Sequence, residues 1–280
     1  PHIRFDGGQL GELPETWAHA QNDAIGYLMW LGSKLAMGGH WQPSGDDIKL
    51  LSNFVQYLEV IRFWQDEDSG HWEEARKVEA SSIGIATVGL TALREYFMTM
   101  TSAQIPLGAT KLLIDQTCRR AETLIEQGHT ALNAILPGEC VQEDTAKQRR
   151  FDAALLFLIY PTQVVTGEMA DLIVLDVVDN LLGPHGIRRY LGDSYWCADY
   201  KLLLDPANRT VDFSDDMSVR DRLLQPGGEA QWCIFDPIIS VIHGLRYQKT
   251  RDAADLARQT EHLNRSLRQL TGDGAEFPPH

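Results

Sequence analysis

The chain has 280 residues, of which 39 are acidic and 25 are basic, and its formal net charge is −14. This acidic surplus argues against nucleic acid and anionic membranes as partners, because both bind basic surfaces. Hydrophobic residues make up 44% of the sequence, which is enough for a sizeable core and argues against disorder. A neutral ligand is therefore the better expectation.

Helical periodicity dominates the sequence from its start. The first stretch carries apolar side chains at helical spacing over residues 17–35, and Gly38 and Gly39 end it. The second stretch opens with Ser44 and Asp47, which have the spacing of a capping box. Further helices are predicted over residues 83–97, 108–136, 149–160, 168–182, 229–247 and 252–271.

These helices predict an all-α fold. No run of alternating residues is long enough to predict a strand, and successive antiparallel helix pairs indicate an array of α/α hairpins or a toroid. Long, charged loops at residues 183–200 and 204–228 are typical of functional loops. No short repeat or low-complexity linker divides the chain, so residues 1–280 are predicted to form a single domain.

Neither a metal nor a cofactor is predicted. The four cysteines form no C-x-x-C pair, and the sequence lacks both metal-ligand histidine spacing and a nucleotide-binding loop. Free thiols are typical of a reducing compartment, which predicts a cytoplasmic location. The longest strongly apolar run, residues 153–160, is far too short to span a membrane and stops at Pro161.

The segment from Asp66 to Gly84 is the most informative stretch. It places Trp72 beside Glu73 and Glu74 in an acidic loop ahead of an apolar helix. An apolar wall and a neighbouring negative charge both raise the pKa of a carboxyl group, as glycosidic bond cleavage requires of its proton donor. The alternative is an ordinary solvated helix start.

Four segments, taken in order, resemble glycoside hydrolase family 15, the glucoamylase group, and its relatives the phosphorylase kinase α and β subunits. They are WAHAQNDAIGYLMWL from Trp17, HWEEARKVEASSIG from His71, FDAALLFLIYP from Phe151 and RRYLGDSYW from Arg188. The resemblance covers nearly the whole chain. It implies an (α/α)6 toroid of which this chain is a fragment, with the N- and C-terminal parts of the ring absent.

The resemblance also implies site residues. Glu73 matches the general acid of the family, and Glu74 matches a second Glu that helps to hold the sugar. Trp17 and Asp23 match a W-x-x-x-Q-x-D pattern that lines the sugar pocket together with Trp72, and Arg189 matches an Arg that grips sugar hydroxyls. From the residues alone, Trp17 could instead be a core residue, Asp23 a first-turn carboxylate and Arg189 a surface charge.

Two functions follow from this reading. The first is an inverting hydrolase of α-glucosidic bonds that acts on an α-glucan or a small α-glucoside, with Glu73 as its acid. The second is a non-catalytic, phosphorylase-kinase-like module that regulates or senses carbohydrate, because those subunits also keep the W-E motif. Inversion needs a second carboxylate about 6.5–9.5 Å from the acid, and neither Glu229 nor Glu276 has the expected surroundings. We therefore expect further segments, or another chain, to complete the ring.

Overall fold

The computed structural model describes residues 5–12, 20–209 and 211–270. Within these ranges the regular structure is helical, with isolated backbone bridges in place of strands, so the predicted all-α class is confirmed. The chain forms two compact units, Pro1–Arg150 with Pro206–Arg220, and Phe151–Asp205 with Asp221–His280. The single domain and the ring expected from the sequence stay predictions.

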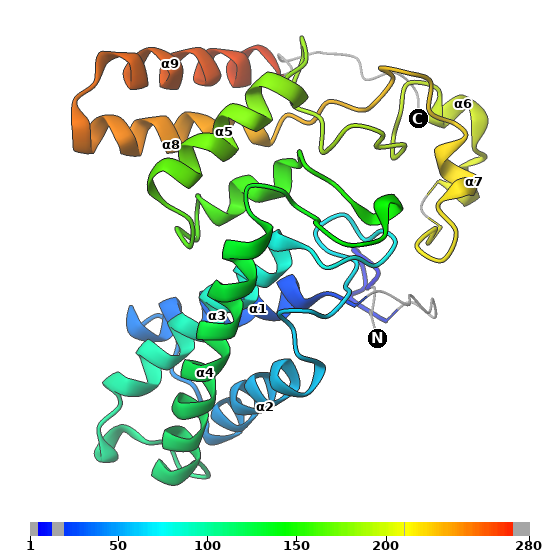
Figure 1. Ribbon diagram of the computed structural model, residues 1–280. Coiled ribbons are helices and arrows are strands. Elements are labelled where there is room, and N and C mark those ends of the chain that lie inside the picture. Colours follow the sequence, from blue (N-terminus) through cyan, green and yellow to red (C-terminus); the bar gives the residue numbers. More distant parts are fainter. Residues whose placement is uncertain (1–4, 13–19, 210, 271–280) are drawn as a thin grey trace. The chain divides into compact units, whose positions relative to one another are not determined.

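Unit 1 is built around α3 (Ala80–Thr99), which packs against α1 (Asn22–Met37) on one side and α4 (Lys111–Ile135) on the other (Figure 1). A further helix, α2 (Gly45–Ile61), packs against α4. Most residues of α3 are buried, which makes this helix the core of the unit. Short 3₁₀ turns lie at η1 (Ser102–Gln104), η2 (Thr145–Lys147) and η4 (Pro206–Asn208).

The crossing of α1 and α3 is a direct contact between backbones. A Cβ atom at Gly26 would lie 2.6 Å from the carbonyl carbon of Ile85, and one at Gly89 would lie 2.5 Å from the carbonyl oxygen of Gly26. Neither position can hold a side chain unless the helices move apart, because close-packed interiors leave no spare volume. The two glycines therefore set the distance between α1 and α3.

The local signals for helix ends are confirmed. α1 ends at Met37 and is capped by Gly38. At the start of α2, the backbone N–H of Asp47 donates to the Ser44 hydroxyl at 3.2 Å, and the backbone N–H of Ser44 donates to the Asp47 carboxylate at 2.8 Å. This reciprocal pair is the capping box that the sequence predicts.

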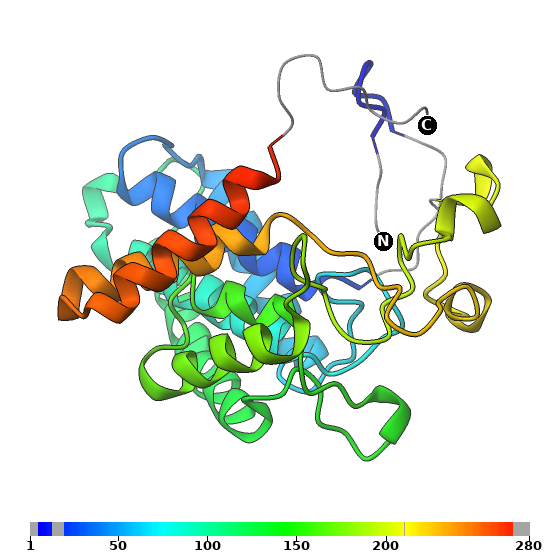
Figure 2. The same ribbon diagram turned by 90° about the horizontal axis from the view of Figure 1, so that it is seen from above.

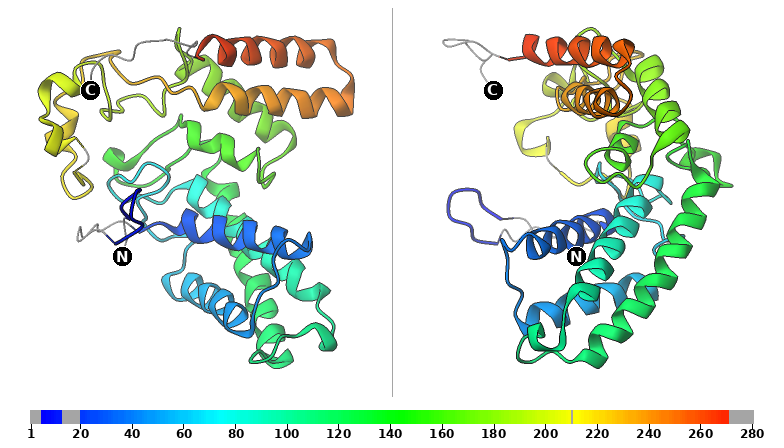
Figure 3. Two further views of the ribbon diagram at one scale, coloured as in Figure 1. Left: turned by 180° about the vertical axis from the view of Figure 1, so that it is seen from behind. Right: turned by 90° about the vertical axis from the view of Figure 1, so that its left-hand side faces the viewer.

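Unit 2 contains α5 (Gly167–Leu181), the short α6 (Tyr200–Leu203), α8 (Phe235–Thr250) and α9 (Ala253–Arg268). The last two form an antiparallel hairpin (Figures 1 and 3), and α9 lies over α8 when the chain is seen from above (Figure 2). A one-turn helix, α7 (Ser218–Asp221), lies where the second stretch of unit 1 ends at Arg220 and the chain returns to unit 2 at Asp221. Such helical pairs are what a segment of an α/α toroid requires.

The helix predicted over residues 149–160 is instead a short 3₁₀ helix, η3 (Ala153–Leu158). Asp152 caps its start by accepting the backbone N–H of Ala154 at 2.8 Å. Pro161 disfavours helical geometry at the residue before it, so the segment between cap and proline has room for at most about two α-helical turns. Among the described residues, no helix is long and apolar enough to cross a membrane.

Candidate functional site

The loop between α2 and α3 is folded back onto the start of α1 in unit 1. Asp68 and Lys77 pair in an antiparallel bridge that closes the loop, with both backbone N···O distances at 2.9 Å. At the tip, the backbone N–H of Ser69 donates to the carbonyl of Ala20 at 2.8 Å. The Glu73 backbone has φ 54°, a left-handed conformation that non-glycine residues seldom adopt outside turns and functional sites. The tip therefore presents residues 71–74 beside the first turn of α1.

A chain of hydrogen bonds runs through His71. Its Nδ1 lies 3.1 Å from the Ser81 hydroxyl, its Nε2 lies 3.1 Å from the Tyr27 hydroxyl, and Ser81 donates to Glu139 at 2.5 Å. Because Ser81 uses its proton on Glu139, it accepts from Nδ1–H, and Nε2 accepts from Tyr27. Burial, and then the charge of Asp23, raise the pKa of Tyr27, so its hydroxyl keeps the proton that it donates.

Asp23, Trp72 and Glu73 gather around this chain. One oxygen of Asp23 lies 3.6 Å from His71 Nδ1, and the other is buried without a hydrogen-bond partner among the described residues. Glu73 is half-buried and accepts from the Gln21 side-chain amide at 2.9 Å. The Trp72 ring is half-buried, 6.2 Å from the His71 ring. The structure thus brings together three of the site residues that the sequence predicts.

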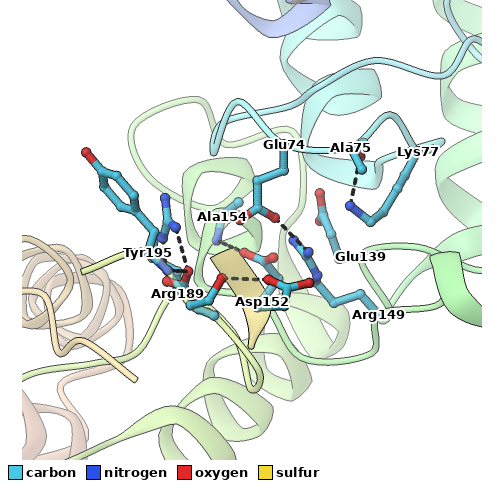
Figure 4. A network of polar contacts seen from close by, with 12 residues as sticks. Glu74, Ala75, Lys77, Glu139, Arg149, Asp152, Ala154, Arg189 and Tyr195 are labelled. Carbon is cyan, nitrogen blue, oxygen red and sulfur yellow. Dashed lines mark hydrogen bonds and ion pairs between the residues drawn. The ribbon is translucent and has the colours of Figure 1, made fainter. Parts of the chain in front are cut away.

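Glu74 points the other way, into the protein, and is 1% exposed. One of its oxygens lies 2.9 Å from a guanidinium nitrogen of Arg149, and the other lies 2.8 Å from one of Arg220 (Figure 4 draws the Arg149 pair). Arg220 ends the second stretch of unit 1, Pro206–Arg220, and is also buried. Glu74 therefore fastens that segment to the loop, while its predicted contact with sugar stays a prediction.

Two more carboxylates, those of Asp68 and Glu79, are buried in this part of unit 1, and each faces other carboxylates. Burial, and then the charge of Asp23, raise the pKa of Asp68 to about 8. Burial, and then the charge of Glu139, raise the pKa of Glu79 well above its ordinary value. The Glu79 carboxylate fills the space where a Cβ atom of Gly70 would lie, so position 70 must be glycine. Both carboxyl groups thus tend to keep their protons near neutral pH.

Arg189 lies in unit 2 and is fully engaged there. Its Nε and Nη2 donate to the two oxygens of Asp193, each at 2.6 Å. The guanidinium carbon lies 4.8 Å from the ring centroid of Tyr195 and 5.5 Å from that of Trp232, and these two rings stack with an interplanar angle of 4° (Figure 4 shows Arg189 and Tyr195). Trp232 thus packs against Tyr195 and Arg189 within unit 2.

Two predicted site residues stay untested as partners of Glu73. Trp17 lies outside the described residues, and Arg189 is described within its own unit. Sequence reasoning in turn missed Gln21, His71 and Glu139. Gln21 is the Q of the W-x-x-x-Q-x-D pattern and His71 directly precedes Trp72, so both residues could have been predicted from the motifs. Glu139 follows a Pro-Gly turn, and no sequence motif marks it.

No known protein-family model matches the chain. It is similar to a probable phosphorylase b kinase regulatory subunit alpha of Caenorhabditis elegans, with 28% identity over 269 residues, which cover 91% of this chain and 19% of that protein. It is also similar to the skeletal muscle phosphorylase b kinase regulatory subunit alpha of Oryctolagus cuniculus, with 28% identity over 191 residues, 65% of this chain and 14% of that protein. The chain thus spans a fifth or less of the length of these relatives.

These relatives overturn the hydrolase reading. They are named as regulatory subunits of a kinase, and the match extends over most of this chain. The prediction of an inverting α-glucosidase is therefore wrong, and so is its classification as an enzyme. The predicted role of Glu73 as a general acid depended on hydrolase activity, and it is withdrawn together with that activity. The W-E motif misled because, as the resemblance implies, regulatory and hydrolytic relatives share it.

Proposed function

We propose that this chain is a non-catalytic regulatory module of the kind found in the regulatory alpha subunits of phosphorylase b kinase, and that it acts within a kinase assembly. The observation that carries the proposal is the similarity over 91% of the chain to such a subunit. In this proposal the module binds a ligand and transmits the effect of binding to the kinase assembly, and it does not turn over a substrate.

The arrangement of the acidic loop supports a binding role. Glu74 is neutralised by two arginines and acts as a fastener, and Glu73 is held by the amide of Gln21. What remains accessible is a half-buried aromatic ring, Trp72, next to fixed polar groups. This combination of an apolar face and a few oriented hydrogen-bonding groups is typical of sites for small neutral ligands.

The ligand of that loop is, in this proposal, a neutral carbohydrate that regulates the module. The partly exposed Trp72 ring offers apolar surface to a sugar, and the Asp23 oxygen that has no hydrogen-bond partner among the described residues offers an acceptor for a hydroxyl. A buried acceptor without a partner is costly, so a hydroxyl donor placed there gains more than it would in water. The acidic surplus of the chain suits a neutral ligand better than an anionic one.

The kinase role is tested on the intact natural protein that contains this chain. Affinity-purified protein is assayed for kinase activity toward phosphorylase b and for release of glucose from maltose. We expect kinase activity to co-purify and glucose release to equal that of a blank. A preparation without any associated protein kinase, or one that hydrolyses maltose, contradicts the proposal.

The carbohydrate role is tested on the chain itself by titrating maltose and following tryptophan fluorescence and heat. Trp72→Phe should lose the fluorescence response and weaken binding, whereas Trp64→Phe, which changes another half-buried tryptophan of unit 1, should keep both. Equal binding by the two variants would separate the loop from the ligand while leaving the kinase role untouched.

A further inference from the structure

Unit 2 has a groove of its own, apart from the acidic loop. It lies between α5, α8 and α9, the three helices that neighbour one another in Figure 1, and its volume is about 550 Å³. A volume of this size suits a small organic molecule. No residue of the acidic loop lines it, so it is a second place where this chain could bind a ligand.

The base of the groove holds a reciprocal pair of aspartate–histidine contacts. His243 of α8 bonds Asp255 of α9 at 2.8 Å, and His262 of α9 bonds Asp236 of α8 at 2.7 Å. The partners on each helix are seven positions apart, so the antiparallel hairpin brings both pairs into register. The two imidazole rings stack, with centroids 6.4 Å apart and an interplanar angle of 14°.

Each carboxylate fixes the orientation of its imidazole. In both histidines Nδ1 is the atom that faces the aspartate, so a neutral ring carries its proton on Nδ1 and leaves Nε2 as an acceptor. Burial lowers the pKa of His243, which keeps that ring neutral. Both side chains line the groove and are at most 5% exposed, and neither Nε2 has a hydrogen-bond partner within the described ranges.

The rim of the groove is acidic. Besides Asp255 at the base, four carboxylates line it, those of Asp171, Asp179, Asp252 and Glu261, against two cations, Arg246 and Arg258. Arg246 is already paired with Asp171 at 2.5 Å. Asp179 and Glu261 are exposed and make no ion pair in the part of the chain that the structure describes. A ligand that carries positive charge is therefore complementary to this rim.

One wall of the groove is apolar. It is formed by Val174, Leu175, Val178 and Leu182 of α5 and its C-terminal end. Half of the Leu175 side chain is exposed, which leaves apolar surface for a ligand to cover. A bare metal ion does not fit these features, because among the described residues no three His, Cys, Asp or Glu side chains are grouped to hold one.

We propose that the groove between α5, α8 and α9 binds a small organic cation, an amine with an apolar body. The ammonium group lies among the carboxylates of the rim and donates to Nε2 of His243 and His262, while the apolar body covers the α5 wall. The site is independent of the carbohydrate role proposed for the acidic loop, since it uses no residue of unit 1.

Isothermal titration of the whole chain with phenethylamine tests the proposal. Two probes of similar size serve as controls, the neutral 2-phenylethanol and the anionic 3-phenylpropionate. We expect saturable binding of phenethylamine with one site per chain, and binding at least about tenfold weaker for both controls, as the loss of two charge contacts predicts.

Two variants locate the site. Asp179→Asn with Glu261→Gln should weaken phenethylamine binding about tenfold, and Leu175→Ser should weaken it by removing part of the apolar wall. The matched control, Glu143→Gln with Glu168→Gln, removes the same charge from two exposed carboxylates outside the groove and should leave binding unchanged. All four charge-changed side chains are exposed, so folding is not at risk.

Several results would overturn the inference. They are an absence of phenethylamine binding, equal binding of the neutral or anionic probe, and an equal loss of binding in the two charge-matched double variants, which would mean attraction to the overall negative charge. Binding of a lysine-rich amphipathic peptide without binding of phenethylamine would make the groove a protein docking surface instead.

Discussion

Buried carboxylates lie both beneath the acidic loop of unit 1 and in the α8–α9 hairpin of unit 2, but their surroundings differ. Asp68 and Glu79 face other carboxylates, and their pKa values are raised. Asp236 is also fully buried, and burial works to raise its pKa, but hydrogen bonds from His262 and Arg265 outweigh that effect and lower it. The partner, and not burial alone, decides whether a buried carboxyl group is charged.

Glu74 is the most strongly paired carboxylate of unit 1 and gives the largest expected effect. Glu74→Gln removes the negative charge that the buried Arg220 and the partly buried Arg149 both contact, which should lower the free energy of unfolding of unit 1 by about 3–5 kcal/mol. Glu73→Gln next to it is the control, because Glu73 is half-buried and should change stability by less than about 1 kcal/mol. Hydrogen exchange of α3 amides in urea measures both, and equal losses would remove the distinction.

The second test concerns the hairpin. Asp236→Asn removes the charge that holds His262 and Arg265, at 2.7 and 2.8 Å. Because Arg265 is partly exposed, we expect a smaller loss, about 2–3 kcal/mol, in the exchange-derived stability of α8. Asp252→Asn, at the exposed cap of α9, is the matched control and should cost little, since Asn caps helices about as well as Asp. A neutral outcome for Asp236→Asn would mean that the pairs are incidental.

The third test concerns Asp68, which should make the folded state less stable as the pH rises. Its folded pKa of about 8 lies above the ordinary value, so the folded state holds a proton that the unfolded state releases. The stability that this proton contributes is complete below about pH 4 and is lost as pH rises through about 8. Asp68→Asn, whose side chain cannot ionise, should therefore already stabilise unit 1 relative to the wild-type chain at pH 6, and should stabilise it more at pH 9.

The measurement is the urea unfolding of unit 1 at several pH values from 5 to 9, with hydrogen exchange of the α3 amides as the readout. The wild-type chain should lose stability across this range, and Asp68→Asn should flatten the slope. In the hairpin the lowered pKa of Asp236 acts in the reverse direction, because its stability is present above about pH 4 and is lost on further acidification. A wild-type profile without slope above pH 6 would contradict the assignment of a retained proton.

The smallest effect is expected from an exposed pair, Glu67 with Lys147. Its atoms are 2.6 Å apart, but the side chains are 42% and 32% exposed. Solvent screens such a pair, so Lys147→Met should cost about 0–1 kcal/mol and nothing measurable in 0.5 M salt. A loss as large as that of Glu74→Gln would mean that geometry outweighs burial in this protein.

Local features of the fold could be predicted, because they depend on neighbours in the sequence. The capping box at Ser44 and the helical periodicity of α3 are of this kind. The helix predicted over residues 149–160 was wrong in its type, because the apolar content of the segment suggests an ordinary helix whereas the short stretch between Asp152 and Pro161 forms a 3₁₀ helix. Periodicity reports burial, and it does not report which helical geometry fits.

The candidate site was less accessible to sequence reasoning. The sequence pointed to the acidic loop as its most informative segment, but the partners of Glu74 could not be foreseen, since Arg220 lies 146 positions away. The function was misassigned for a related reason. A motif preserves the residues that shape a loop, whereas the difference between hydrolysis and regulation depends on groups that lie elsewhere in the fold.

The contact between Gly26 and Gly89 has a consequence for the loop. The backbones of α1 and α3 touch there without any side chain that could yield, so the position of α1 is set by the main chain itself. Gln21 and Asp23 lie about one turn before this contact, and they meet the loop at Glu73 and His71. The absence of a Cβ atom at Gly26 and at Gly89 thus sets how closely α1 approaches α3. A side chain at either glycine would displace α1. The Gln21 amide and the Asp23 carboxylate would then no longer reach Glu73 and His71.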